Sequence, residues 1–169
     1  MSISLLRTNM DFIDLFDKHV DTVYRIALMM LNNVPEAEDV TQTAFIKLMT
    51  SNKNFENDEH VKAWLIVTTQ NICRNLLKSW WRVKRVDIET IADQPVFEAS
   101  DGEIWNIVSD LDEKYKLPVY LHYYEGYKTE EIASILGVNH ATIRTRLRTA
   151  RKKLKLILED ENNECKQFV

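Results

Sequence analysis

The scarcity of glycine and proline is the feature that most constrains the fold of this chain. Only three glycines and three prolines occur in 169 residues, whereas hydrophobic residues make up 45% of the sequence. Strand-rich folds need many tight turns, which these two residues commonly form, and a chain this rich in apolar residues can bury a core. The composition therefore predicts an all-α protein. No apolar run approaches the roughly 18 residues that a membrane-spanning helix needs, so we expect no membrane insertion.

Three amphipathic segments predict three helices in the first half of the chain. Apolar residues recur at steps of three and four from Phe12 to Leu31, from about Pro35 to Met49 and from about His60 to Arg82. The Asn-Asn pair at positions 32 and 33, followed by a proline, predicts the break between the first two helices. The polar stretch 51–59 predicts a loop before the third.

Charge is distributed in three blocks of alternating sign. Residues 60–86 contain six Lys or Arg and no acid, residues 87–113 contain nine acids and no base, and residues 140–156 contain seven bases and no acid. The net charge of −4 argues against a nucleic-acid partner, but counterion release acts locally, so the two basic blocks predict one. Solvated helix faces are the alternative. The acidic stretch 87–109 predicts a flexible linker between two small helical domains, residues 1–86 and 110–169.

The segment from Tyr127 to Leu156 predicts a helix-turn-helix. Thr129 is placed to cap a first helix, Gly137 suits the left-handed residue of a tight corner, and Asn139 is placed to cap a second helix. Upstream, Pro118 is expected to open or interrupt another helix. The second helix of the motif has one apolar face, made by Ile143, Leu147, Ala150 and Leu154.

The opposite face of that second helix carries candidate DNA-binding residues. Arg144 and Arg148 are four positions apart and stand one above the other, where they can reach guanine edges or phosphates. The complete candidate set for duplex DNA is Thr129, His140, Ala141, Thr142, Arg144, Thr145, Arg148, Arg151 and Lys152. An ordinary helical hairpin with a basic surface is the alternative interpretation.

A resemblance to sigma factors of the sigma-70 family connects the two halves. Their C-terminal region, which recognises the −35 promoter element, is similar to LPVYLHYYEGYKTEEIASILGVNHATIRTRLRTARKKL (Leu117–Leu154). Their segment that docks on the polymerase clamp helices resembles AEDVTQTAFIKL (Ala37–Leu48). Their segment that opens and reads the −10 element resembles AWLIVTTQNICRNLL (Ala63–Leu77). The motif order, the short chain and the absence of a third domain between the motifs resemble the extracytoplasmic-function (ECF) group.

The resemblance implies two further sets of site residues. Polymerase docking is expected from Glu38, Asp39, Gln42 and Phe45. Recognition and melting of the −10 element are expected from Phe55, Asn57, Asp58, Asn71, Arg74, Asn75, Lys78 and Arg82. From Asn71 to Lys78 these residues recur at steps of three and four, so they form one polar stripe suited to unpaired bases and a strand backbone. For the docking segment, N-terminal helix acids above a core phenylalanine are an equal alternative.

The tandem Trp80-Trp81 is unusual for the family. Core packing, a stacking platform and a contact for an inhibitor are three interpretations of it, and the sequence does not rank them.

Nothing in the sequence predicts catalysis. The four histidines and the isolated Cys73 and Cys165 have neither metal-ligand nor triad spacing, and no Gly-rich phosphate loop occurs. We therefore expect no metal, no cofactor and no enzymatic activity. The resemblance implies a cytoplasmic promoter-specificity subunit whose partners are core RNA polymerase, promoter DNA and an anti-sigma factor. A helix-turn-helix regulator that binds an operator alone is the alternative, and a polymerase-binding adaptor that does not start transcription is a third hypothesis.

Overall fold

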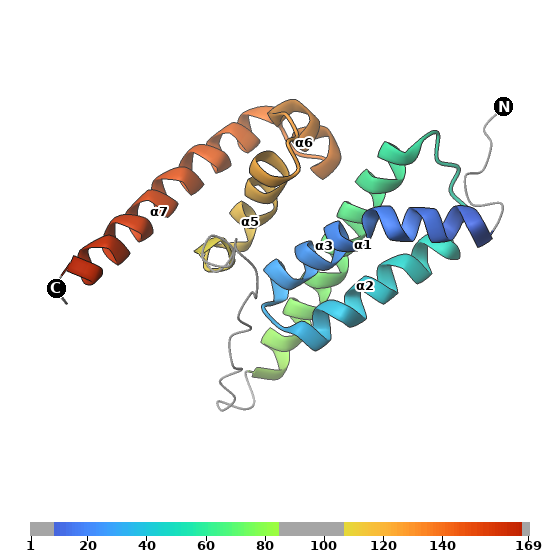
Figure 1. Ribbon diagram of the computed structural model, residues 1–169, viewed down its shortest axis with the longest axis horizontal. Coiled ribbons are helices and arrows are strands. Elements are labelled where there is room, and N and C mark those ends of the chain that lie inside the picture. Colours follow the sequence, from blue (N-terminus) through green and yellow to red (C-terminus); the bar gives the residue numbers. More distant parts are fainter. Residues whose placement is uncertain (1–8, 85–106, 167–169) are drawn as a thin grey trace. The chain divides into compact units, whose positions relative to one another are not determined.

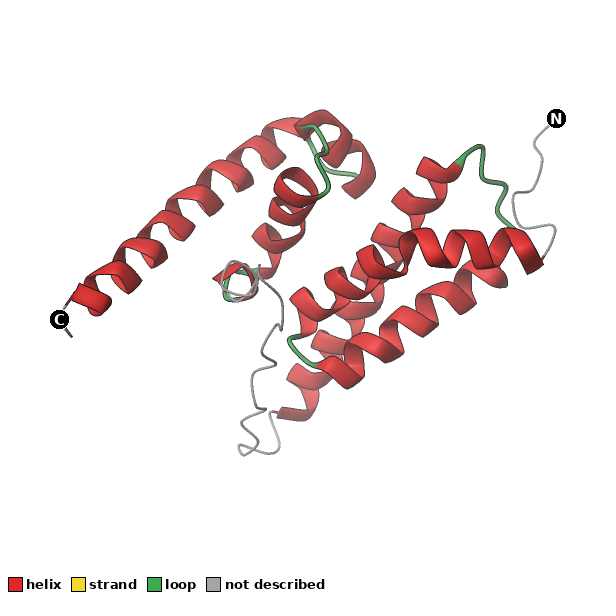
Figure 2. Ribbon diagram, viewed as in Figure 1, coloured by secondary structure: helices red, strands yellow, loops and turns green. Residues whose placement is uncertain are grey.

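The computed structural model describes residues 9–84 and 107–166, with the side chains of residues 11–81 and 107–155. Within these ranges every regular element is a helix, which confirms the all-α fold (Figure 1, Figure 2). The chain divides into two compact units, Met1–Pro95 and Val96–Val169. Residues 85–106, which include most of the predicted acidic linker, lie outside the described residues.

The first unit is a bundle of three helices, α1 (Asn9–Leu31), α2 (Val34–Met49) and α3 (Asp58–Lys84). Each helix packs against the other two (Figure 1). A single amphipathic helix cannot bury its apolar face alone, and the bundle buries all three. The core contains Leu15, Val23, Ala44, Phe45, Leu48, Phe55, Val61 and Leu65.

The break between α1 and α2 follows from the two asparagines, as predicted. Asn32 adopts a left-handed conformation with φ 50°, which ends α1 while its N–H still donates to the Leu28 carbonyl at 2.8 Å. Asparagine tolerates this conformation better than most residues. The Asn33 side chain then accepts the Glu36 N–H at 3.0 Å, and Pro35 occupies the first turn of α2. The chain therefore reverses within two residues.

The second unit contains α5 (Glu113–Val119), the π-helix η1 (Tyr120–Tyr124), α6 (Thr129–Leu136) and α7 (His140–Lys166). Both α5 and α6 pack against α7. Residues 107–109 are also helical, with Ile107 and Val108 buried. These three residues therefore belong to the packed unit, which corrects the linker predicted to extend through residue 109.

Pro118 lies inside a helical run, which corrects the expectation that it opens or interrupts a helix. It is the sixth residue of α5, and the chain continues directly into η1. Proline lacks the N–H that an α-helix needs at this point and crowds the preceding turn. The wider π turn begins two residues later, after the position at which Pro118 supplies no N–H to the helix. Gly126, with φ 76°, then ends the run.

The corner between α6 and α7 forms as the sequence predicts. Gly137 has φ 63° and ψ 35°, and the Val138 N–H donates to the Ala133 carbonyl at 3.0 Å, which closes α6. The Asn139 side chain accepts the Ala141 N–H at 2.7 Å and caps α7. Buried Ile132, Ala133, Ile143, Leu147 and Ala150 fill the contact between the two helices and the rest of the unit.

The prediction that Thr129 caps α6 is wrong. The helix begins at Thr129, and the preceding residue, Lys128, holds the capping position. Its backbone N–H donates to the Glu131 carboxylate at 2.7 Å, so the glutamate satisfies this amide at the helix N-terminus. The Thr129 hydroxyl is left for another contact, described below.

Gly137→Ala is expected to destabilise the α6–α7 corner by about 1–2 kcal/mol, since it places a Cβ in the left-handed region. A Cβ at this position meets no heavy atom within 4 Å, so the cost is that of the backbone alone. Gly137→Asn should destabilise the corner less, because asparagine tolerates the left-handed region better than alanine. Amide hydrogen exchange of α6 and α7 in the full chain measures the effect locally, and Ser134→Ala, an exposed change inside α6, is the control. Unchanged exchange in Gly137→Ala would contradict the strain argument.

Candidate nucleic-acid interface

One side of α7 exposes a basic stripe, as the sequence predicts. Its exposed members are Ala141, Arg144, Thr145, Arg148, Arg151 and Lys152. His140, Thr142 and Thr129 lie beside the stripe and are half-buried. The interior of the unit holds the opposite face of the helix, where Ile143, Leu147 and Ala150 are buried. The helix therefore separates a packing face from a charged face along its length.

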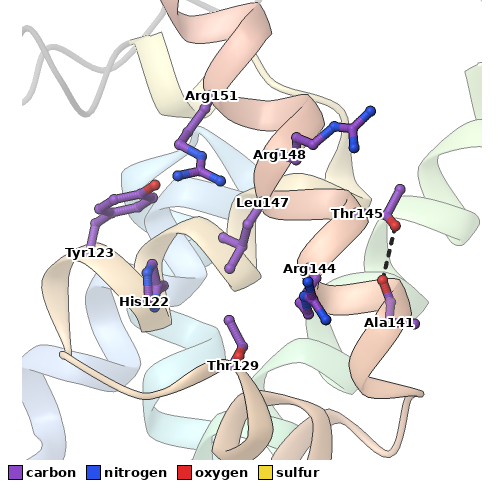
Figure 3. A pocket seen from close by; sticks show the side chains of 9 residues that line it. All are labelled: His122, Tyr123, Thr129, Ala141, Arg144, Thr145, Leu147, Arg148 and Arg151. Carbon is purple, nitrogen blue, oxygen red and sulfur yellow. Dashed lines mark hydrogen bonds between the residues drawn. The ribbon is translucent and has the colours of Figure 1, made fainter.

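The α7 stripe forms one wall of a groove of about 430 Å³ (Figure 3). Arg144, Arg148 and Arg151 line it together with His122 and Tyr123 of η1 and Thr129 of α6. Figure 3 shows Arg151 extending towards Tyr123. The guanidinium groups of these three arginines can donate hydrogen bonds to phosphate oxygens and to guanine edges. The groove is therefore chemically suited to the acceptor-rich surface of a nucleic acid.

His122 and Tyr123 were missed in the sequence. The His122 Nδ1 lies 2.9 Å from the Tyr127 carbonyl oxygen, which only accepts, so Nδ1 carries the proton. That bond leaves Nε2 as the other polar atom of the ring. Tyr123 is 55% exposed. A π turn holds more residues than an α turn and shifts which side chains face α7, so a period of 3.6 residues could not place this pair.

The N-termini of α6 and α7 are joined by a side-chain hydrogen bond. The Thr129 hydroxyl lies 2.7 Å from His140 Nε2, and Glu130 Oε1 lies 3.4 Å from the same nitrogen. A hydrogen bond from its own backbone amide, together with the His140 ring and the Thr129 hydroxyl, lowers the pKa of Glu130. Thr129 and His140 thus bind each other, which fixes the tip of α7 relative to α6.

The polar stripe predicted on α3 is present on the surface of the first unit. Asn71, Asn75 and Lys78 are exposed and Arg74 is half-buried. On the other side of the helix Thr69, Gln70 and Cys73 are buried. The side chain of Arg82 lies outside the described residues. The helix therefore presents amide and cationic groups to solvent along at least two turns.

The loop before α3 is held against the bundle by contacts of its own side chains. Phe55 is 6% exposed and packs edge-on against the Trp64 ring, with centroids 5.8 Å apart. The Asn57 side chain accepts the His60 N–H at 2.9 Å and caps α3. Asp58 accepts a hydrogen bond from the buried His19 ring at 3.1 Å. This corrects the prediction for Phe55, and it gives Asn57 and Asp58 partners inside the protein.

The predicted docking face of α2 is exposed, with one correction. Glu38, Asp39 and Gln42 are exposed, but Phe45 is only 3% exposed, and its ring centroid lies 4.7 Å from that of Phe16. Phe45 therefore belongs to the core, as the alternative interpretation proposed. The exposed stripe continues instead through Ile46 and Met49, which are 57% and 61% exposed. These two lie four and seven residues after Gln42, and this helical spacing is the signal in the sequence that places them on the same face.

No metal site is evident in the part of the chain that the structure describes, where no three His, Cys, Asp or Glu side chains are grouped to hold an ion. The described helices also include none long and apolar enough to cross a membrane.

Comparison with known proteins identifies the family. Residues 15–83 match the model of Sigma-70 region 2, and residues 101–154 match that of Sigma-70, region 4. The chain belongs to the sigma-70 family, in its ECF group. This sigma factor is 28% identical over 147 residues to the RNA polymerase sigma factor SigV of Bacillus subtilis. The alignment covers 85% of this chain and 89% of SigV. It is 26% identical over 167 residues to the ECF RNA polymerase sigma factor SigW of the same organism, and that alignment covers 88% of this chain and 89% of SigW.

A solved structure supports the fold of this sigma factor. It is the sigma factor RpoE in complex with the anti-sigma factor NepR from Bartonella quintana, with a TM-score of 0.73 and 22% identity. The match covers 88% of this chain and 97% of that one. Region 2 of this sigma factor corresponds to α1–α3, and region 4 includes the helix-turn-helix of α6 and α7.

Asn57→Ala is expected to destabilise region 2 by about 1 kcal/mol, since it removes the cap of α3. Asn57→Ser keeps a capping oxygen and should retain most of the stability. Urea unfolding and exchange of the first α3 amides measure both variants. Normal stability of Asn57→Ala, combined with weaker binding to a −10 strand, would instead identify Asn57 as a base contact.

Proposed function

We propose that this sigma factor is a dissociable promoter-specificity subunit that reads the −10 element through α3 and the −35 element through α7. The observation that carries the proposal is the presence of two separate polar and basic stripes, one on region 2 and one on region 4. A regulator that binds one operator needs a single reading helix per chain. In this account the subunit acts in the cytoplasm and has no catalytic activity, since the polymerase performs the chemistry.

Region 4 is suited to duplex DNA. The major groove is about 12 Å wide and admits an α-helix. Ala141 at the tip of α7 is small and exposed, so the N-terminal turn can approach the bases closely. Arg144 and Arg148 then face the base edges, and Arg151 and Lys152 lie further along towards phosphate. The contact between Thr129 and His140 holds this tip in one orientation.

Region 2 is suited to a single strand. The amides of Asn71 and Asn75 can pair with the hydrogen-bonding edges of unstacked bases, and Lys78 can hold the backbone. A duplex hides these base edges, so the α3 stripe is expected to act on DNA that has opened. Because the loop residues Phe55, Asn57 and Asp58 have partners within the bundle, α3 carries the reading function in this account.

The α2 stripe is proposed to bind core polymerase. Glu38, Asp39 and Gln42 form its polar part, and Ile46 and Met49 form its apolar end. Interfaces commonly combine an apolar centre with a polar rim. An acidic and apolar stripe complements a partner helix with basic and apolar side chains, which is the surface expected of the polymerase clamp.

An anti-sigma factor is proposed as a further partner. The RpoE structure from Bartonella quintana contains such a protein bound to its sigma factor. The exposed Ile46 and Met49 are needed for polymerase in this account, so a protein that covers them blocks docking. Competition between polymerase and inhibitor for one surface would then regulate the factor.

Run-off transcription with core polymerase tests the proposed function. We expect promoter-specific transcripts from genomic templates when the chain is added and none with core polymerase alone. The absence of any specific transcript would contradict the proposal. Tight, specific binding of the free chain to duplex DNA, without transcription, would identify an operator-binding regulator instead.

Arg144→Ala is expected to weaken binding of the −35 duplex by about 1–3 kcal/mol and to relax the preference at one base pair. Arg144→Lys keeps the positive charge but cannot form a bidentate hydrogen bond with guanine, so the variant should lose more specificity than affinity. Arg151→Ala, the matched control in the groove, should weaken all sequences uniformly. Binding of a set of singly substituted duplexes measures all three. A uniform loss in Arg144→Ala would make Arg144 a phosphate contact.

Glu38→Lys combined with Gln42→Ala should weaken the affinity for core polymerase by about tenfold, since it cancels the negative charge of the docking stripe. Thermal stability should not change, because both side chains are exposed. Glu56→Lys, an exposed charge reversal outside α2, is the matched control and should bind normally. Wild-type polymerase affinity in the double variant would contradict the docking assignment.

A further inference from the structure

Trp81 is the most exposed large hydrophobic side chain among the described residues, with 73% of its surface accessible. It lies near the end of α3, three residues after Lys78 and seven after Arg74. Residues at these helical spacings lie on the same side, so the indole flanks the polar stripe. Its neighbour Trp80 is half-buried and points to a different side of the helix. Core packing within the described bundle is therefore excluded for Trp81.

The surroundings of Trp81 indicate what kind of molecule would cover it. The other large apolar side chains exposed in region 2 lie on α1 and α2, so on the described part of α3 Trp81 is the one exposed large apolar side chain, next to exposed Lys78 and half-buried Leu77. A protein partner usually buries a contiguous apolar patch. A single aromatic ring beside cationic and amide groups is instead the combination that binds single-stranded nucleic acid, with a base stacked on the ring and phosphates held by the cations.

The positive charge of this segment and the length of α3 both agree with single-stranded nucleic acid as the ligand. Residues 60–86 contain six basic and no acidic residues, so an acidic ligand is attracted along α3 beyond its first turn, which carries Asp58 and Glu59. From Asn71 to Trp81 the helix rises by about 15 Å, which matches about four stacked nucleotides. One strand can therefore reach the asparagines, Lys78 and the indole together.

We propose that Trp81 is a stacking platform for an unpaired base of the promoter, at the C-terminal end of the α3 stripe. The proposal rests on the function proposed above and adds a binding position to it. Stacking requires only the face of a base, so Trp81 contributes affinity for the open strand while the asparagines contribute sequence preference. The indole holds the strand after it separates and thereby favours the open state.

The test uses holoenzyme assembled from core polymerase and the wild-type chain, Trp81→Leu, Trp81→Tyr or Trp80→Leu. The probe is a fluorescent single strand that carries the −10 region of a promoter mapped by run-off transcription. A second set of probes has one base removed at successive positions. We expect Trp81→Leu to bind the intact strand about tenfold more weakly and Trp81→Tyr to retain most of the affinity. Trp80→Leu should keep the wild-type pattern.

The base-deleted probes give the decisive result. Wild-type holoenzyme should lose affinity when one particular base is missing, and Trp81→Leu should be insensitive to that same deletion because the partner of the base is already absent. Equal affinity of Trp81→Leu and wild type for every probe would overturn the proposal, as would a loss that is the same for every base-deleted probe. So would a weakened affinity of Trp81→Leu for core polymerase, which would identify a protein contact. Failure of the wild-type holoenzyme to transcribe would contradict the proposed function itself, whereas normal transcription and strand binding by Trp81→Leu would contradict only the stacking platform.

Discussion

Both basic stripes depend on burial of the opposite faces of the helices that carry them. On α7, Ile143, Leu147 and Ala150 are buried against α5 and α6. On α3, Leu65, Ile66 and Cys73 are buried in the three-helix bundle. Burial of an apolar side chain is worth about 1.5–3 kcal/mol, and rotation of either helix would expose several at once. The hydrophobic effect therefore fixes which side of each helix meets the solvent.

Short polar contacts then set where each of these helices begins. Asn57 and Asn139 each accept a backbone N–H at the first turn of the helix that follows. The left-handed Gly137 and the bond between Thr129 and His140 fix the angle at which α7 leaves α6. Reading groups placed on rigid helices lose less entropy on binding than groups on loops. The same contacts that end one helix and start the next thus prepare the surface for its ligand.

The parts predicted from the sequence are those governed by local physics. The helices follow from apolar periodicity, and the corner at Gly137 and the cap at Asn139 follow from backbone preferences that single residues express. Apart from the Thr129 cap, where Lys128 holds the capping position instead, the errors concern which residues are buried and how the helices are accommodated. Phe45 and Phe55 were expected to contact polymerase and DNA, with a core position left open for Phe45, and the neighbouring helices bury both. The π-helix, and with it His122 and Tyr123, depends on how the backbone accommodates Pro118. The exposed position of Ile46 and Met49 could have been predicted from their spacing after Gln42, but apolar residues were assigned to the core.

The central proposal is that two helices of a single chain read two separate elements of one promoter. Site-specific photocrosslinking tests it most directly, with a photoreactive residue at position 75 on α3 or at position 144 on α7, in complexes of holoenzyme and promoter. The account predicts crosslinks from position 75 to the opened strand of the −10 element and from position 144 to the −35 duplex, on the same DNA. Crosslinks from both positions to one element, or crosslinks from position 75 that do not require open DNA, would contradict it.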